Sequence, residues 1–398
     1  MTAAAVLLPM AAMAQAAFTA YVSPQYEYNT NVFDLSAGVP VTGTNDTRHG
    51  DSDLVSRGGL IGDYLAGRQD FYVNIDAANY KYQHFTELDR DEYAAAAGWR
   101  WVVVRDLTGT FDVSRTKFMV PFSALLTQTG QLVLETVQKE SAAVQYQFNP
   151  DWRIDGSVFR RREEAPIPNA PQLNLTDTAV STTLTYTRNA RLTGGANFTY
   201  DTGKYDQGVA NLAPNYHEIS VSGVANYAAK GLSSFSGLLG YTKRSSLTGT
   251  NDVSSVTGSL EYKRQLTGKT SMDLNISRSV NANITNTGSE VDTMVGGSLT
   301  WQATYKLSAA LAYSWTNRYL PDQNGLPGEQ IQVGGSRTDN TQYVGLNLDY
   351  QILRWLDIKP YFNYQTRSSN AQFGDYNATV VGVTVTAKYS RGTPVAAR

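Results

Sequence analysis

The sequence has 398 residues, of which 41% are hydrophobic and only 17% charged, and its net charge is −2. The near-neutral charge excludes nucleic acid as an expected partner, and the absence of cysteine excludes disulfides, thiolate metal sites and cysteine nucleophiles. The 25 tyrosines and 33 glycines favour pleated, half-buried strands over helices.

The chain begins with a small, apolar segment over residues 3–14. Ala12-Met13-Ala14 has the small-x-small pattern that precedes signal peptidase cleavage, and Ala14-Gln15-Ala16 offers an alternative site. We therefore assign residues 1–16 to a signal-peptide remnant, with a buried N-terminal strand or helix as the alternative. No later apolar run reaches the roughly 20 residues of a membrane-spanning helix, so a membrane-embedded chain must span as a barrel.

Strand-length segments of alternating hydrophobicity follow. In residues 307–316, Leu307, Leu311 and Trp315 share one face, while Ser308 and Thr316 share the other. The same alternation recurs in residues 180–186, 192–201 and 271–277. This period of two predicts strands with one apolar and one polar or small face, although a strand of a soluble sandwich has the same pattern.

The connections between these segments alternate between short and long. Short turns fall at residues 67–68, 105–106, 149–151, 188–190, 229–231, 266–268, 305–306 and 353–354. Longer polar stretches fall at residues 29–51, 117–135, 163–177, 200–215, 245–253, 279–291 and 319–339. Short periplasmic turns and long outer loops are typical of outer-membrane barrels. The sequence predicts an all-β fold, a single antiparallel transmembrane β-barrel of about 18 strands over residues 17–391, with about 16 strands as the alternative. Residues 392–398 would form a periplasmic tail.

Most strands that enter a short turn end in an aromatic residue, and these residues recur about every 40 positions. They are Tyr64, Trp101, Tyr146, Tyr186, Tyr227, Tyr262, Trp301 or Tyr305, and Tyr350. Tyr and Trp place an apolar body in lipid and a polar tip in water, so such a row predicts an aromatic girdle at the inner membrane interface. The alternative is the aromatic core of a soluble β-protein.

The opposite face of the strands carries charges of both signs. A barrel of about 16–18 strands encloses an aqueous channel, so this face is expected to line the lumen and most of its charges to serve solvation. The charged residues are Asp76, Arg100, Arg153, Asp155, Arg161, Asp201, Glu218, Arg244, Glu261, Lys263, Asp273, Asp357, Lys359 and Arg367.

Aromatic residues also fall on the lumen face, where a ring can stack on a sugar or simply fill space near a rim. The candidate sugar contacts are Tyr72, Tyr361, Arg153, Asp155, Glu261 and Lys359. One connection, residues 117–135, is too apolar for a loop in water and is expected to fold against another part of the protein. It predicts either an inward-folded constriction loop or a longer strand pair with a bulge. The candidate constriction residues are Phe118, Pro121, Phe122, Leu125 and Leu126.

Catalytic patterns are sparse. The sequence has only 3 histidines, at positions 49, 84 and 217, and neither a Gly-x-Ser-x-Gly nor a His-Glu-x-x-His motif. The Asx-rich stretch around Asp46 and Asp51 is typical of turns. We expect no enzyme activity, no cofactor and no metal site, and a barrel hydrolase is a distant third function.

Several short motifs resemble proteobacterial β-barrels encoded in exopolysaccharide gene clusters. The segment from Tyr26 to Phe33 resembles the Asp/Asn-x-Asn-(Val/Leu)-Phe opening of the exosortase-associated exopolysaccharide barrels and of the related β-barrel porin 2 group. Gly98-Trp99-Arg100-Trp101, Ser114-Arg115-Thr116 and Asn149-Pro150-Asp151-Trp152-Arg153 are also similar. The chain departs from many barrels in placing its last aromatic residue, Tyr389, nine residues before the end.

The resemblance implies a channel in the outer membrane of a Gram-negative bacterium that takes part in export or assembly of an extracellular polysaccharide. The alternative is a general or substrate-selective diffusion porin for small solutes. Both functions need a polar lumen and neither needs an active site, so the sequence does not separate them. The expected partners are outer-membrane lipid and lipopolysaccharide, the outer-membrane assembly machinery, and a polysaccharide or small solutes.

Overall fold

A computed structural model of the chain describes residues 15–41, 46–124, 132–166, 174–189, 191–206, 215–229, 232–247, 252–282, 289–321, 336–371 and 374–392. These residues form an antiparallel sheet of eighteen strands that closes into a barrel. The strand count and the all-β class predicted from the sequence are confirmed. No helix in this part of the chain is long and apolar enough to cross a membrane.

Each strand pairs with its neighbours in sequence. The strands and two short 3-10 helices are β1 (Gln15–Asn29), β2 (Asp51–Ala66), β3 (Gln69–Tyr82), η1 (Thr86–Leu88), β4 (Arg90–Val104), β5 (Leu107–Met119), η2 (Phe122–Ala124), β6 (Leu134–Gln147), β7 (Trp152–Glu164), β8 (Leu175–Asn189), β9 (Leu192–Tyr205), β10 (Tyr216–Ala229), β11 (Ser233–Ser246), β12 (Val253–Thr267), β13 (Thr270–Ala282), β14 (Ser289–Gln302), β15 (Leu307–Leu320), β16 (Arg337–Leu353), β17 (Leu356–Ser369) and β18 (Tyr376–Arg391).

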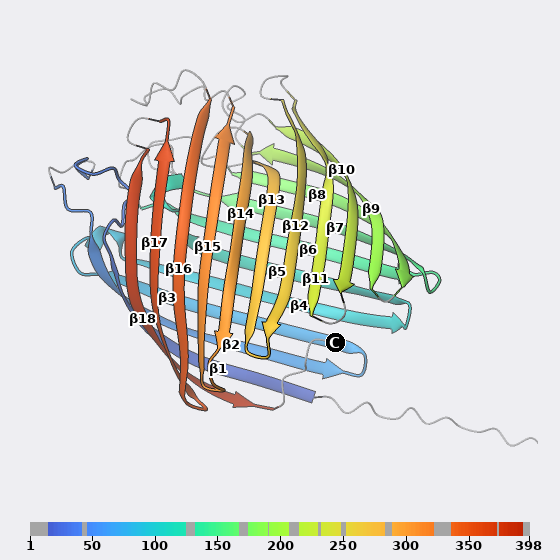
Figure 1. The fold of residues 1–398 in the computed structure, drawn as a ribbon, viewed down its shortest axis with the longest axis horizontal. Helices are drawn as coiled ribbons and strands as arrows, with labels where there is room; N and C mark the ends of the chain where they lie inside the picture. The colour runs from blue at the N-terminus through green and yellow to red at the C-terminus, as the bar shows by residue number, and fades with distance from the viewer. Residues whose placement is uncertain are drawn as a thin grey trace, which may run out of the picture.

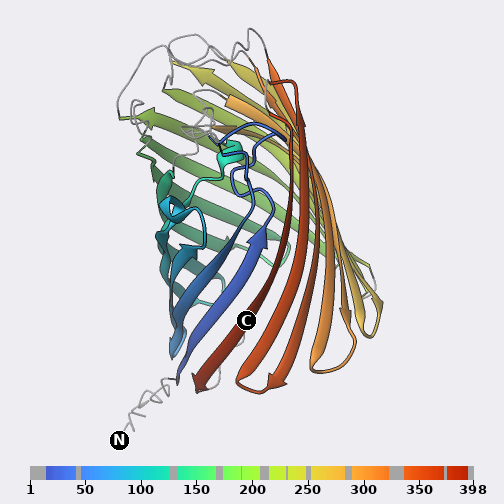
Figure 2. The ribbon, with the colours of Figure 1, turned by 90° about the vertical axis from the view of Figure 1, so that its left-hand side faces the viewer.

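The two ends of the chain close the barrel. β1 pairs with β18 from Phe18–Arg391 to Asn29–Val380, and this seam is interrupted opposite Pro24, which has no backbone N–H. A pair of hydroxyls, Ser23 Oγ and Thr386 Oγ1, lies 2.7 Å apart across the interruption. Figure 1 looks through the wall formed by β12–β18 onto strands of the opposite wall, and Figure 2 shows the seam side.

An apolar belt covers the outside of the barrel. Exposed side chains on this face include Val22 at 59%, Leu311 at 49% and Ile276 at 46%. Aromatic residues at the short-turn end, such as Tyr64 and Trp301, are also exposed on it. A belt of this kind with an aromatic border matches the lipid face of a membrane barrel.

Several strands extend further at the long-loop end than the sequence pattern indicated. β9 continues to Tyr205 and β13 to Ala282, inside stretches that were expected to be loops. The alternation is masked there because beyond the apolar belt no face of the strand lies against lipid, and residues such as Tyr205 and Val280 are buried against other parts of the protein. β1 begins at Gln15, within the range assigned to the signal remnant.

Candidate channel and its outer mouth

The register of the sheet determines which side chains face the lumen. Residues that lie directly opposite each other on paired strands share a face. Leu274, for example, pairs with Tyr262 and Gly297 on the lipid side, while Asp273 pairs with Lys263 and Ser298 on the lumen side. The same reasoning places all fourteen charged residues assigned to the lumen from the sequence on the inner face.

Four tyrosines on the inner face share one arrangement with the two strands beside them. Each tyrosine lies opposite a glycine, that glycine lies opposite a carboxylate on the next strand, and the tyrosine hydroxyl donates to this carboxylate. We call these units Tyr–Gly–acid triplets. They are Tyr21–Gly59–Asp76, Tyr72–Gly98–Asp112, Tyr361–Gly382–Glu27 and Tyr216–Gly203–Asp177.

The glycine in each triplet lets the aromatic ring lie flat on the wall. A Cβ atom built on Gly98 would overlap the ring of Tyr72, and one built on Gly382 would overlap Tyr361. With glycine in place, the hydroxyl of Tyr72 reaches Asp112 Oδ1 at 2.5 Å. A ring that lies across a glycine covers bare backbone and leaves the lumen wide.

Three of the four triplets form a continuous band from β17 to β5, which we call the tyrosine wall. Tyr361 and Glu27 lie toward the outer end, Tyr21 and Asp76 near the middle, and Tyr72 and Asp112 toward the short-turn end. Arginines accompany the band: Arg57 Nε lies 3.8 Å from Asp76 Oδ1, and the Arg100 guanidinium lies 4.6 Å from the centre of the Tyr72 ring. One side of the channel therefore combines aromatic surfaces with fixed charges.

The six candidate sugar contacts do not converge on one site. Tyr72 and Tyr361 both belong to the tyrosine wall, and Lys359 lies beside Tyr361 on the lumen face of β17. Arg153, Asp155 and Glu261 lie elsewhere on the lumen surface, and all four charged candidates form ion pairs with lumen neighbours. The pairs are Arg153–Asp155 at 2.9 Å, Lys263–Glu261 at 2.7 Å and Lys359–Asp349 at 2.9 Å.

The outer end of the lumen holds an apolar cluster contributed by four connections between strands and by the barrel wall. Phe33, which is 1% exposed, has its ring centre 4.8 Å from that of Phe85 and 5.1 Å from that of Phe122. We call this set the mouth cluster; it comprises Val32, Phe33, Leu35, Val41, Phe85, Leu88, Val120, Phe122, Val133, Ala165, Leu175, Tyr205 and Tyr216. It extends from the loops beside β1–β6, through Ala165 after β7, to β8–β10, and so follows half of the ring of strands at the mouth.

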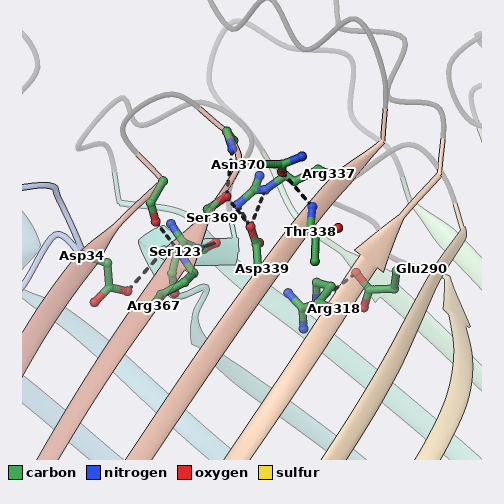
Figure 3. A network of polar contacts seen from close by, with 12 residues as sticks. Asp34, Ser123, Glu290, Arg318, Arg337, Thr338, Asp339, Arg367, Ser369 and Asn370 are labelled. Carbon is green, nitrogen blue, oxygen red and sulfur yellow. Dashed lines mark hydrogen bonds and ion pairs between the residues drawn. The ribbon is translucent and has the colours of Figure 1, made fainter.

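A polar latch holds the tip of the connection between β5 and β6 against the far side of the mouth. Arg367 on β17 donates from Nη1 to the carbonyl of Ser123 at 2.6 Å, and the Ser123 N–H donates to Asp34 Oδ2 at 3.2 Å (Figure 3). Burial raises the pKa of the Asp34 carboxyl, while its hydrogen bonds to Ser123 and the charge of Arg367 oppose that shift. The tip is therefore fixed by a second loop and by the barrel wall.

Arginine–carboxylate pairs surround the latch and continue along the outer part of the lumen. Arg337 binds Asp339 through two contacts, Nε–Oδ1 at 2.9 Å and Nη2–Oδ2 at 2.8 Å (Figure 3). On the opposite side of the barrel, Arg161 Nη2 lies 2.8 Å from Asp177, and Arg244 Nη2 lies 2.7 Å from Glu218. The outer part of the lumen therefore holds paired charges of both signs, most of them buried.

The candidate constriction residues do not share one environment. Phe122 is 3% exposed inside the mouth cluster, whereas Phe118 is half-buried on the lumen face at the end of β5. Pro121 is exposed. Leu125 and Leu126 lie outside the described residues.

The loop between β1 and β2 packs against the connection between β5 and β6, which the sequence did not predict. The sequence pattern places residues 30–41 in a polar outer loop, but Phe33 and Leu35 are 1% and 3% exposed in the mouth cluster. The concentration of the apolar residues Val32, Phe33, Leu35, Val39 and Val41 in one short segment is the signal that indicates burial.

The histidines and acids of the outer loops have structural roles here. Asp51 accepts hydrogen bonds from the backbone N–H groups of His84 (3.0 Å) and Phe85 (2.8 Å), and so fixes the loop that carries η1. Across the described ranges, no group of three or more His, Asp or Glu residues is arranged to hold a metal ion.

A family of known proteins matches the C-terminal part of the chain, and several solved structures match nearly the whole barrel. The family described as "Putative beta-barrel porin 2" matches residues 239–389. The structure is similar to the outer membrane protein OpdK of Pseudomonas aeruginosa, with 11% identity and a TM-score of 0.49 over 94% of this chain and 99% of that chain. OpdQ of the same organism has 10% identity and a TM-score of 0.47 over 95% of this chain and 98% of that chain. Its siderophore receptor PirA has 10% identity and a TM-score of 0.46 over 94% of this chain and 80% of that chain. None of the curated proteins matches the sequence.

A closed barrel of eighteen strands, an apolar outer belt, a polar lumen and the porin match together define a porin-like outer-membrane β-barrel. The match falls on the β-barrel porin 2 group, one of the two groups that the sequence motifs resemble. The association with exopolysaccharide gene clusters stays a prediction.

Proposed function

We propose that the protein is a diffusion channel for small hydrophilic solutes in the outer membrane of a Gram-negative bacterium, narrowed at its outer mouth by inward-folded loops. This is the second of the two functions expected from the sequence. The porin match supports it, and so does the hydrophilic lumen with charges of both signs.

The observation that carries the proposal is the anchored tip at Ser123. This tip starts from the wall at β5 and β6 and contacts Arg367 on β17, so it extends over the opening rather than away from it. A polysaccharide chain in transit would need a wide opening and would have to displace buried side chains such as Phe33 and Phe122. At about 1.5–3 kcal/mol for each fully buried large side chain, that displacement is costly. Small solutes need only the space that the loops leave.

Single-channel recording in planar bilayers tests the narrowed mouth. Replacing residues 123–130 by a Gly-Ser linker removes the anchored tip, so conductance is expected to rise. Arg367→Ala, which removes only the latch, is expected to increase conductance fluctuations. Arg153→Ala is the matched control, because Arg153 lies on the lumen face and pairs with Asp155 outside the latch. Unchanged conductance in both folded mouth variants would place the restriction elsewhere in the barrel.

Solute size separates diffusion from polysaccharide export. Liposomes that contain the protein are expected to admit monosaccharides faster than oligosaccharides, with a steep decline as the chain lengthens. In cells, deletion of the gene is expected to lower uptake of small solutes and leave secreted polysaccharide unchanged. Loss of secreted polysaccharide with normal solute uptake would overturn the proposal in favour of export.

A further inference from the structure

An apolar groove of about 650 Å³ lies on the outer surface of the barrel between β10 and β14. Its floor includes the outward-facing Gly223 and Gly237, and its sides include Leu239 and Val256, which are 69% and 58% exposed. The groove is therefore part of the lipid-facing belt, but it is a recess in that belt.

The recess exists because its floor glycines are uncovered. A Cβ atom built on Gly237 would have its nearest neighbour at 3.6 Å, and one built on Gly223 at 3.9 Å, so both positions have room for a side chain. The triplet glycines in the lumen have no such room, because tyrosine rings occupy it. Space at the groove is open to whatever lies in the membrane beside it.

A cation borders the groove. The ladder between β12 and β13 ends at the pair Gly258–Arg278, although both strands continue beyond it. At this point Arg278 donates from Nε to Ser255 Oγ at 3.1 Å and from Nη1 to Thr293 Oγ1 at 2.6 Å. These hydroxyls orient the guanidinium but do not neutralise it.

Arg278 lies near the outer edge of the apolar belt. It is eight residues beyond Thr270, the first residue of β13. At about 3.3 Å per residue and a strand tilt of about 40°, this corresponds to roughly 20 Å along the membrane normal, within an apolar band about 25 Å tall. The exposed Lys243 faces outward on nearby β11, and neither cation forms an ion pair with any residue that the structure describes.

We propose that this groove binds one phosphorylated, acylated lipid of the outer leaflet, of the lipopolysaccharide class. One acyl chain occupies the recess above Gly223 and Gly237, and a phosphate of the headgroup pairs with Arg278 and Lys243. The recess accepts an apolar chain. Arg278 at its edge and Lys243 on β11, which form no ion pair with a described residue, accept an anion.

Two variants test the halves of the site separately. Gly237→Leu fills the recess, and Arg278→Gln removes the charge at its edge. Each has a matched control on β7: Gly156 is another outward glycine with room for a Cβ atom, 3.7 Å from its nearest neighbour, and Arg160 faces outward eight residues beyond the start of its strand. The controls are Gly156→Leu and Arg160→Gln.

The measurement is native mass spectrometry of the full chain after titration of the delipidated, refolded protein with purified lipopolysaccharide. We expect one lipid per wild-type barrel, and about tenfold weaker binding in each groove variant because a charge-assisted contact or the chain site is lost. Both controls should bind as wild type does. Equal binding by the groove variants and wild type would overturn the proposal, as would equal losses in the controls. Equal retention of a zwitterionic phospholipid in place of lipopolysaccharide would overturn the headgroup assignment.

Discussion

The tyrosine wall and the lipid-facing groove use the same residue for opposite results. On the tyrosine wall, Gly59, Gly98 and Gly382 face the lumen and each is covered by the ring of a tyrosine from the neighbouring strand. In the groove, Gly223 and Gly237 face lipid, and no side chain occupies the position that a Cβ atom would take. A covered glycine gives a flat aromatic surface, whereas an uncovered one gives a recess.

The difference shows that the role of a strand glycine depends on the residue beside it in the register. A tyrosine opposite the glycine fills the gap and secures its own hydroxyl on a carboxylate one strand further on. Small or aliphatic neighbours, such as Ala196 and Leu239 on either side of Gly223, leave the gap open. Four substitution experiments test whether the two faces differ as this comparison requires.

The largest effect is expected from a charge placed on the lipid face. Leu311→Lys or Leu274→Lys puts an ammonium group into the apolar belt and should destabilise the folded barrel by about 2–4 kcal/mol. Ser277→Lys and Ser298→Lys place the same group in the polar lumen and should have mild effects. Unfolding in urea after insertion into lipid vesicles measures the difference. Equal tolerance on both faces would contradict the assignment of lumen and lipid sides.

The second largest difference is expected when alanine replaces one glycine that is covered by a tyrosine ring and one that is uncovered. In Gly98→Ala the new Cβ atom overlaps the Tyr72 ring and the Asp112 carboxylate, so a cost of about 1–3 kcal/mol is expected. In Gly237→Ala the nearest neighbour is at 3.6 Å, and the change should stay within about 0.5 kcal/mol. The same unfolding measurement applies. Similar costs at both positions would show that the tyrosine ring does not depend on the missing side chain.

A double-mutant cycle identifies the ring as the cause of the cost. Gly382→Ala should destabilise the wild-type barrel but should cost almost nothing in a Tyr361→Ala background, which gives a coupling of about 1–2 kcal/mol. The control pair is Gly237→Ala with Tyr361→Ala, whose effects should add within about 0.5 kcal/mol because the residues are on different walls and faces. A coupling energy of zero between Gly382→Ala and Tyr361→Ala would show that the tyrosine ring is not the cause of the cost at Gly382.

The smallest expected effect comes from removing one hydroxyl. Tyr21→Phe keeps the ring over Gly59 and loses the 2.5 Å hydrogen bond to Asp76, so a loss of about 1 kcal/mol is expected. Tyr313→Phe is the counterpart on the lipid face, where Tyr313 is 46% exposed, and should be close to neutral. If both changes cost the same, the carboxylate of the triplet contributes nothing to holding the ring.

The fold was predictable because the membrane imposes a simple rule on the sequence. Lipid on one side and water on the other make the two faces of each strand different, and the alternation in residues 307–316 records that difference directly. Each of the eight short turns joins two such strands, and the first and last strands of the chain bring the predicted count to eighteen. Strand ends were less predictable, as at Tyr205 and Ala282, because the rule no longer applies beyond the membrane.

The site was predictable only in part. The apolar composition of residues 117–135 indicated a loop that folds against the protein, and Phe122 does lie buried; its role as a pore constriction stays a prediction. The triplets could not be found from the sequence, because Tyr21, Gly59 and Asp76 are far apart in the chain. Only the register of three strands brings them together.

The seam between β1 and β18 also determines when a complete barrel can exist. The hydroxyls of Thr19 and Ser390, 371 positions apart in sequence, meet across it at 2.9 Å. Until β18 has been delivered, β17 and β1 would be open edges with unpaired N–H and C=O groups, which invite association with other chains and have no place in lipid. Closure therefore comes last, and a chain cut short before Tyr376 should be treated by the cell as an aggregation hazard rather than as a smaller pore.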